Sequence, residues 1–154
     1  MLNRLQGVFA SLNSHDVKYV VIGGMAAILH GVPRATFDVD ILIEATPANA
    51  GSLLTALKAA GFGTADLIGT EELLAHEITI FKDRCRIDVQ TRTPGIAFTD
   101  AWARRVEMKV AGQPFWVASR EDVIRSKRAA GRSIDLEDAR LLEAGEADLG
   151  ARGA

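Results

Sequence analysis

Apolar residues recur along the first part of the chain with two different periods. In residues 2–12 they recur every three to four positions, which predicts an amphipathic helix. Residues 17–22 and 37–43 are short runs rich in β-branched residues, typical of buried strands. A short helix is expected at residues 25–30, and a longer one begins at Thr46 and Pro47 and ends near Gly61. This part of the chain therefore predicts alternating helices and strands.

The middle of the chain predicts two β-hairpins. Residues 77–81 and 86–91 have strand character and are separated by a short polar segment, a spacing suited to an antiparallel pair. Residues 106–110 and 115–117 flank a second turn and form the other expected hairpin. Because strands alternate with helices in the first part and form hairpins here, the sheet is predicted to be mixed.

Helices are expected to dominate the last part of the chain. One is predicted at 98–105 and another after Ser119, whose acidic partner Asp122 stands three residues later. Asp135 and Asp138 repeat this spacing and predict a last helix that ends near Gly145. The fold class is therefore α/β (α+β), with one domain over residues 1–145 and a mixed sheet flanked by helices. Residues 146–154 are small, polar and glycine-containing, and we expect a flexible tail.

Composition narrows the class of protein. The 154 residues are 48% hydrophobic and 25% charged, as expected of one globular domain with a real core. The net charge of −2 creates no general attraction for nucleic acid, so small substrates fit better and any RNA contact must be local. The single Cys85 and the lack of a charged-then-apolar leader favour a cytoplasmic location. The apolar runs are strand-sized, and no membrane association is expected.

Three aspartates stand inside apolar strands, where a carboxylate is costly unless it has a partner. Asp38 and Asp40 are two residues apart, so both side chains emerge on one face, about 7 Å apart at Cα. Asp88 has the same position in its own strand, between the inward residues Ile87 and Val89. Three such carboxylates suit Mg²⁺, which prefers oxygen ligands and keeps substrate phosphates. Two ions could activate a hydroxyl and neutralise a leaving pyrophosphate.

Other interpretations of these residues stay open. Asp38 and Asp40 could end their strand at a solvated loop, and Asp88 could simply pair with Arg86 on an exposed strand. Gly23 and Gly24 stand between a strand and a short helix, where backbone amides can approach phosphate, but such a pair is also ordinary turn geometry.

Several later residues are candidates for binding a phosphorylated ligand. Lys127 falls on the apolar stripe of its helix and is expected to face inward, either to hold a triphosphate or to extend its stem past the core to solvent. Arg132 could bind phosphate or be a solvated cation at a helix end. Arg34 could neutralise phosphate or anchor its loop, and Thr36 could cap or contact a donor. Asp135 and Asp138 are most simply helix-capping acids.

The glycine pair, Gly31, Arg34, Thr36 and the strand with Asp38 and Asp40 together resemble the signature of the DNA polymerase beta-like nucleotidyltransferase superfamily. The chain also looks like small bacterial AbiEii-type toxin nucleotidyltransferases, because the residues at its end resemble their downstream motif: Lys127, Arg132, Asp135 and Asp138. The resemblance covers residues 19–142. Toxins of this type usually carry more sequence, so an acceptor-binding module is expected to be missing.

The resemblance implies a nucleoside triphosphate donor, Mg²⁺, and Asp38, Asp40 and Asp88 as catalytic metal ligands. It implies transfer of a nucleotide to a hydroxyl on RNA, protein or a small molecule, within or outside a toxin–antitoxin pair. A second hypothesis is a non-enzymatic nucleotide-sensing or antitoxin-like module with the same donor pocket. A third is a metal-dependent phosphohydrolase that uses water as the acceptor. Retention of all three acids favours transfer, whereas the short chain favours the sensor.

Overall fold

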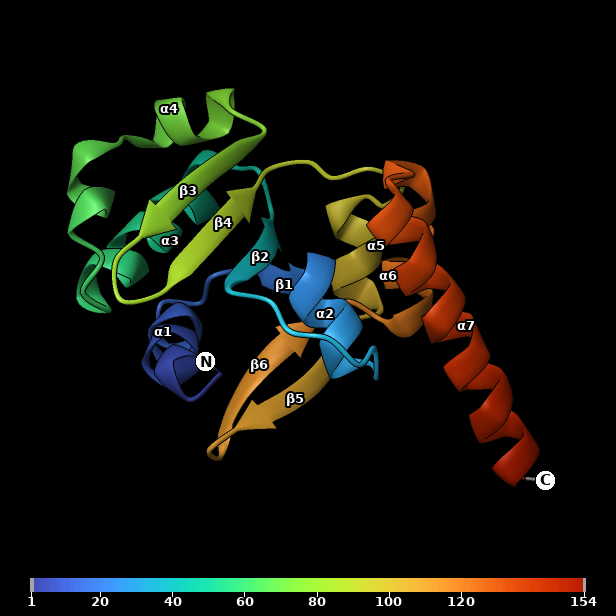
Figure 1. The fold of residues 1–154 in the computed structure, drawn as a ribbon. Helices are drawn as coiled ribbons and strands as arrows, with labels where there is room; N and C mark the ends of the chain where they lie inside the picture. The colour runs from blue at the N-terminus through green and yellow to red at the C-terminus, as the bar shows by residue number, and fades with distance from the viewer. Residues whose placement is uncertain (1, 154) are drawn as a thin grey trace.

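The computed structural model describes residues 2–153, which form one mixed six-stranded sheet with helices on both sides (Figure 1). The sheet order is β3-β4-β2-β1-β6-β5. The strands are β1 (Tyr19–Ile22), β2 (Asp38–Ile43), β3 (Ile78–Lys82), β4 (Arg86–Gln90), β5 (Val106–Val110) and β6 (Gln113–Val117). β2 runs parallel to β4, and β1 runs parallel to β6, whereas the other neighbours are antiparallel. The expected mixed sheet and both expected hairpins are confirmed.

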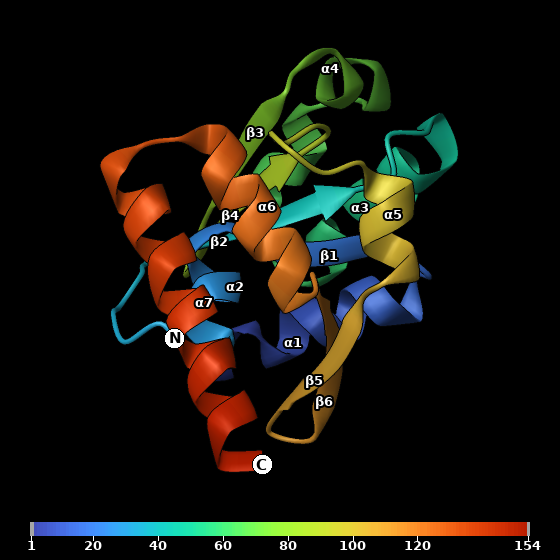
Figure 2. The same ribbon diagram turned by 90° about the vertical axis from the view of Figure 1, so that its right-hand side faces the viewer.

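The helices lie in two groups, as Figure 2 shows from the side of α6 and α7. α2, α6 and α7 lie in front of the sheet in that view, and α1 and α3 lie behind it. The helices are α1 (Leu2–Ser14), α2 (Gly23–Leu29), α3 (Pro47–Ala59), α4 (Thr70–Ala75), α5 (Phe98–Ala103), α6 (Arg120–Ala130) and α7 (Ser133–Gly153), with a 3₁₀ turn at Gly63–Leu67. Within the described residues, no helix has the length and apolarity needed to cross a bilayer.

The central strands are packed on one face and carry the carboxylates on the other. Val39, Ile41, Ile87 and Val89 are at most 2% exposed and belong to the hydrophobic core. This burial positions Asp38, Asp40 and Asp88, because the residue next to each buried one points to the opposite face.

Two expectations about element boundaries are wrong, and one helix was not predicted. α7 begins at Ser133 and continues through Gly153 instead of ending near Gly145, because Ala, Glu and Leu in this stretch favour continued helix. Phe37 precedes β2 rather than packing in it, and it is 88% exposed. The helix α4 was not expected, since its six residues are too few to show a clear period.

Candidate active site

The parallel pairing of β2 with β4 brings the three aspartates together. In this register Asp40 lies beside Asp88, and Asp38 lies beside Arg86. One carboxylate oxygen from each aspartate can be chosen so that all three lie within 4.8 Å of one another. Asp38 and Asp40 are half-buried and Asp88 is buried. Three closely spaced, partly desolvated carboxylates form a donor set that fits a hard divalent cation such as Mg²⁺.

Asp40 carries the electrostatic cost of this arrangement. Burial, reinforced by the negative charges of Asp38 and Asp88, raises the pKa of Asp40 to about 6. The raised pKa means that ionised Asp40 destabilises the metal-free fold: the effect is absent below the unfolded pKa near 3.8 and complete above about 6. A bound cation would offset that cost. The amide of Gln90 already offsets part of it by donating to Asp40 Oδ1 at 3.3 Å.

The glycine pair has a packing role next to these acids. Gly23 adopts φ +67°, and a Cβ added there would lie 2.5 Å from Asp40 Oδ2. A Cβ at Gly24 would lie 3.1 Å from a guanidinium nitrogen of Arg34. Gly23 therefore lets the β1–α2 turn approach Asp40 closely, a requirement that any side chain would violate.

The segment before β2 is anchored at both Arg34 and Thr36. The Thr36 hydroxyl donates to Asp38 Oδ1 at 2.9 Å and orients that carboxylate. Arg34 donates to both carboxylate oxygens of Asp138 on α7, at 3.1 and 2.7 Å. The anchoring alternative for Arg34 is thus present in the structure, although its guanidinium also lies against Gly24.

Lys127 lies buried at the junction of α6 and α7. Its ammonium contacts Asp135 at 3.2 Å and Asp138 at 3.0 Å. Arg132 also binds Asp135, with Nε 2.7 Å from Oδ2. Burial would raise the pKa of Asp135 and Asp138, but hydrogen bonds from Arg132, Arg34 and Lys127 outweigh it and hold both pKa values below the usual range. The inward orientation of Lys127 is confirmed, but its ammonium pairs with two buried carboxylates instead of extending to solvent, a pairing that the sequence did not predict.

The spacing of Asp135 and Asp138 predicted that Asp135 is the N-cap of the last helix, and this prediction is wrong. It lies in the first turn of α7, which begins at Ser133, and accepts a hydrogen bond from the backbone N–H of Arg132 at 3.3 Å. This is the reciprocal contact of a capping box, made by the acid inside the helix. The side chain thus caps the helix and neutralises Lys127 at once.

Arg86 and Asp88 form a bidentate ion pair, with Nε and Nη2 of Arg86 lying 2.8 and 3.0 Å from the two carboxylate oxygens of Asp88. The ion pair with Arg86, which the sequence offered as the alternative to metal binding by Asp88, is therefore present. Asp88 is nevertheless only 7% exposed and belongs to the carboxylate cluster. The ion pair holds Asp88 in place without removing it from the site.

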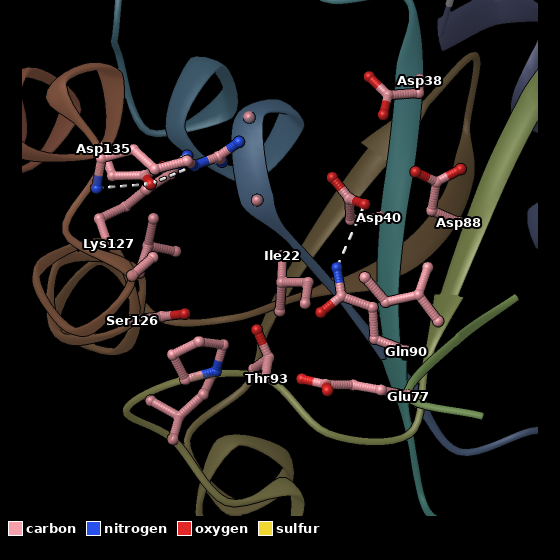
Figure 3. A pocket seen from close by; sticks show the side chains of 18 of the residues that line it. Ile22, Asp38, Asp40, Glu77, Asp88, Gln90, Thr93, Ser126, Lys127 and Asp135 are labelled. Carbon is pink, nitrogen blue, oxygen red and sulfur yellow. Dashed lines mark hydrogen bonds and ion pairs between the residues drawn. The ribbon is translucent and has the colours of Figure 1, made fainter. Parts of the chain in front are cut away.

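These groups line a cavity of about 480 Å³ (Figure 3). Asp38, Asp40 and Asp88 lie on the sheet side, and Lys127 and Asp135 lie across from them on the helical side. Of the expected residues, Arg34 and Thr36 do not line the cavity but contact Gly24 and Asp38, which do. These expected residues line it: Gly23, Gly24, Asp38, Asp40, Asp88, Lys127 and Arg132. Gln90 was missed as a site residue, although its place two positions after Asp88 puts it on the same face.

Comparison with known proteins identifies the class to which this architecture belongs. The fold matches a solution structure of the antibiotic-resistance factor ANT(2'')-Ia, with a TM-score of 0.54 and 14% identity over 97% of this chain and 90% of that one. The family "Nucleotidyltransferase of unknown function (DUF6036)" matches residues 3–144, and the chain belongs to this family. A search of curated proteins finds no match. The expected superfamily-level assignment, a nucleotidyltransferase, is confirmed.

Proposed function

We propose that the protein is a magnesium-dependent nucleotidyltransferase that moves a nucleoside monophosphate from a nucleoside triphosphate to a hydroxyl and releases pyrophosphate. The observation that carries this proposal is the cluster of Asp38, Asp40 and Asp88, with oxygens within 4.8 Å of one another, at a cavity with cationic residues on its far side. Family membership supports nucleotidyl transfer as the reaction.

The cavity suggests a division of roles between its two sides. Asp38, Asp40 and Asp88 would hold two Mg²⁺ ions, which neutralise charge on the triphosphate and on the leaving pyrophosphate. Thr36 and Gln90 would keep Asp38 and Asp40 oriented through their hydrogen bonds. Asp88 would orient the attacking hydroxyl and take its proton.

The donor triphosphate would lie toward the helical side of the cavity. Lys127 and Arg132 line that side, and the side chain of Arg132 is 74% exposed although its guanidinium is bound to Asp135, so a phosphate would share it with that carboxylate. Gly23 and Gly24 line the cavity, so the backbone of this turn would lie near the phosphates, and Arg34 contacts the turn at Gly24. An AbiEii-type toxin role is a narrower form of the same proposal and rests on the resemblance of Lys127, Arg132, Asp135 and Asp138 to the downstream motif of those toxins.

One observation favours a nucleotide sensor as the second candidate. Lys127, the buried cation nearest to the proposed triphosphate side, already contacts two carboxylates. A phosphate would therefore have to share Lys127 with Asp135 and Asp138. A module that binds donor weakly and transfers nothing would fit this pairing.

The test is incubation of the protein with Mg²⁺, each labelled nucleoside triphosphate and a cell extract that supplies acceptors. We expect a labelled product and a magnesium-dependent rise in melting temperature, because a ligand selective for the folded state stabilises it. Asp40→Asn should lose both responses while raising the melting temperature of the metal-free protein at pH 7, since it removes the destabilising charge. Normal magnesium-dependent nucleotide binding by Asp40→Asn would contradict the site.

Lys127→Met tests the triphosphate side. Methionine keeps an apolar stem and loses the ammonium, so we expect triphosphate affinity to fall about tenfold while nucleoside affinity changes little. The variant should also melt at a lower temperature, because Asp135 and Asp138 lose a partner. Arg128→Met is the matched control: it removes another cation from α6, one that pairs with Glu143. Equal loss of triphosphate and nucleoside binding would leave Lys127 a purely structural role.

A further inference from the structure

β3 forms an open edge of the sheet beside the active site. Among the described residues it pairs only with β4 (Figure 1). The Glu77 carbonyl accepts from Thr91 N at 3.0 Å, and Asp83 N donates to the Cys85 carbonyl at 3.0 Å. In an antiparallel ladder, backbone groups of successive residues point alternately toward and away from the neighbour. The N–H and C=O groups of the intervening residues, Ile78, Ile80 and Lys82, therefore point to the free edge.

The same edge residues carry exposed apolar side chains on the active-site face. Ile78 is 49% exposed and Ile80 is 53% exposed. Ile80 is the cross-strand partner of Asp88, which in turn lies beside Asp40. Ile80, Asp88 and Asp40 are thus cross-strand neighbours, which places the open edge two strands away from Asp40. Edge strands are usually protected by proline or by a central charge, but the only charge in β3 is at its end, on Lys82.

The distribution of charge around the cavity suggests that the acceptor binds on the β3 side. Lys127 and Arg132 lie on the opposite side, where the proposed donor triphosphate would bind. On the β3 side, Arg86 is already bound to Asp88, Lys82 shares the face of Ile80 at one end of β3, and Glu77 lies just before the other end. The two cations on this side, Lys82 and Arg86, are matched by the carboxylates of Glu77 and Asp88 and give no net attraction for a polyanionic acceptor, whereas an extended polypeptide would find backbone partners and an apolar floor.

We propose that the acceptor is a tyrosine in a partner polypeptide that adds as a strand to the free edge of β3; this deepens the proposed function and rests on it. Neighbouring strands lie about 4.8 Å apart, so the added strand would run about 10 Å from β4. A serine or threonine hydroxyl is too close to its own backbone to span that gap. A tyrosine ring lying over Ile80 carries its hydroxyl toward Asp88.

The step is a simple displacement at phosphorus. The tyrosine oxygen forms a bond to the α-phosphorus, and the bond from that phosphorus to the bridging oxygen breaks. Pyrophosphate leaves with the electron pair, and the phenolic proton passes to Asp88. The product is a tyrosine–nucleotide phosphodiester.

The experiment uses a short soluble peptide of alternating valine and threonine with one central tyrosine, and matched peptides with serine or phenylalanine at the centre. With Mg²⁺ and labelled triphosphate, only the tyrosine peptide should be labelled. Ile80→Pro should raise the KM for this peptide about fivefold beyond the effect of Ile80→Ala, because proline removes an edge donor that β4 does not use. Neither variant should alter the magnesium-dependent melting shift with triphosphate alone.

Three results would overturn the tyrosine proposal: equal labelling of the serine peptide, an unchanged KM in Ile80→Pro, or labelling of an RNA oligonucleotide in preference to the peptide. If Ile80→Pro does not fold, Ile80→Asp keeps the edge donor and removes the apolar floor, and it should also raise the KM. Transfer to another acceptor in extract, with no labelled peptide, would defeat this inference and leave the proposed function intact. Absence of magnesium-dependent nucleotide binding would defeat both.

Discussion

Asp88→Asn should lower nucleotide transfer by about a hundredfold or more while leaving donor binding largely intact. Asparagine preserves the size of the side chain in β4 and removes the charge that would orient the acceptor hydroxyl and take its proton. Asp38 and Asp40 remain to hold the donor with its metal. The magnesium-dependent melting shift with triphosphate should therefore persist, and a labelled-transfer assay measures the loss of turnover.

This variant also separates the candidate functions. A nucleotide sensor would show the melting shift in both proteins and transfer in neither. If Asp88 serves only to pair with Arg86, the asparagine variant would transfer at the parent rate. Arg86→Gln is the complementary control, since it breaks the ion pair and keeps the Asp88 carboxylate.

Gly23→Ala should abolish magnesium-dependent nucleotide binding and transfer together. Its Cβ would lie 2.5 Å from Asp40 Oδ2, so the carboxylate or the turn must move. The backbone at φ +67° adds a strain of about 1 kcal/mol for any residue with a side chain. Titration should show a large loss of nucleotide affinity, whereas the melting temperature of the metal-free protein should change little.

Gly7→Ala is the matched control for that substitution. An added Cβ at Gly7 meets nothing within 4 Å, and the residue lies in the helix α1, so nucleotide binding should be unchanged. Parent-like magnesium and nucleotide affinity in Gly23→Ala would show that the close approach of the turn to Asp40 has no part in the site.

Local periodicity predicted much of this architecture, and contacts between distant segments account for the rest. Alternation within each strand was enough to put Asp38 and Asp40 on one face. The register that sets Asp88 beside Asp40 depends on how β2 meets β4, which no local pattern specifies. The inward face of Lys127 followed from helical spacing, but its partners Asp135 and Asp138 depend on how α7 docks on α6.

The Phe37 prediction shows where alternation fails. It treated residues 37–43 as one strand and so put Phe37 on the packed face with Val39. The strand begins only at Asp38, and Phe37 lies in the irregular segment before it, where the Thr36 hydroxyl donates to the Asp38 carboxylate. Period-two arguments hold only inside the hydrogen-bonded ladder, whose first residue the apolar pattern does not define.

The dependence of Lys127 on α7 has a consequence for biosynthesis. The ribosome makes Asp135 and Asp138 after every strand of the sheet and after Lys127 itself. Until α7 has emerged and docked, the nascent domain holds an uncompensated cation, and Arg34 lacks its anchor. The sheet can form earlier, but the wall of the cavity opposite the carboxylates is completed only when this last helix arrives. Any activity of the site is therefore postponed until translation has passed the α7 segment.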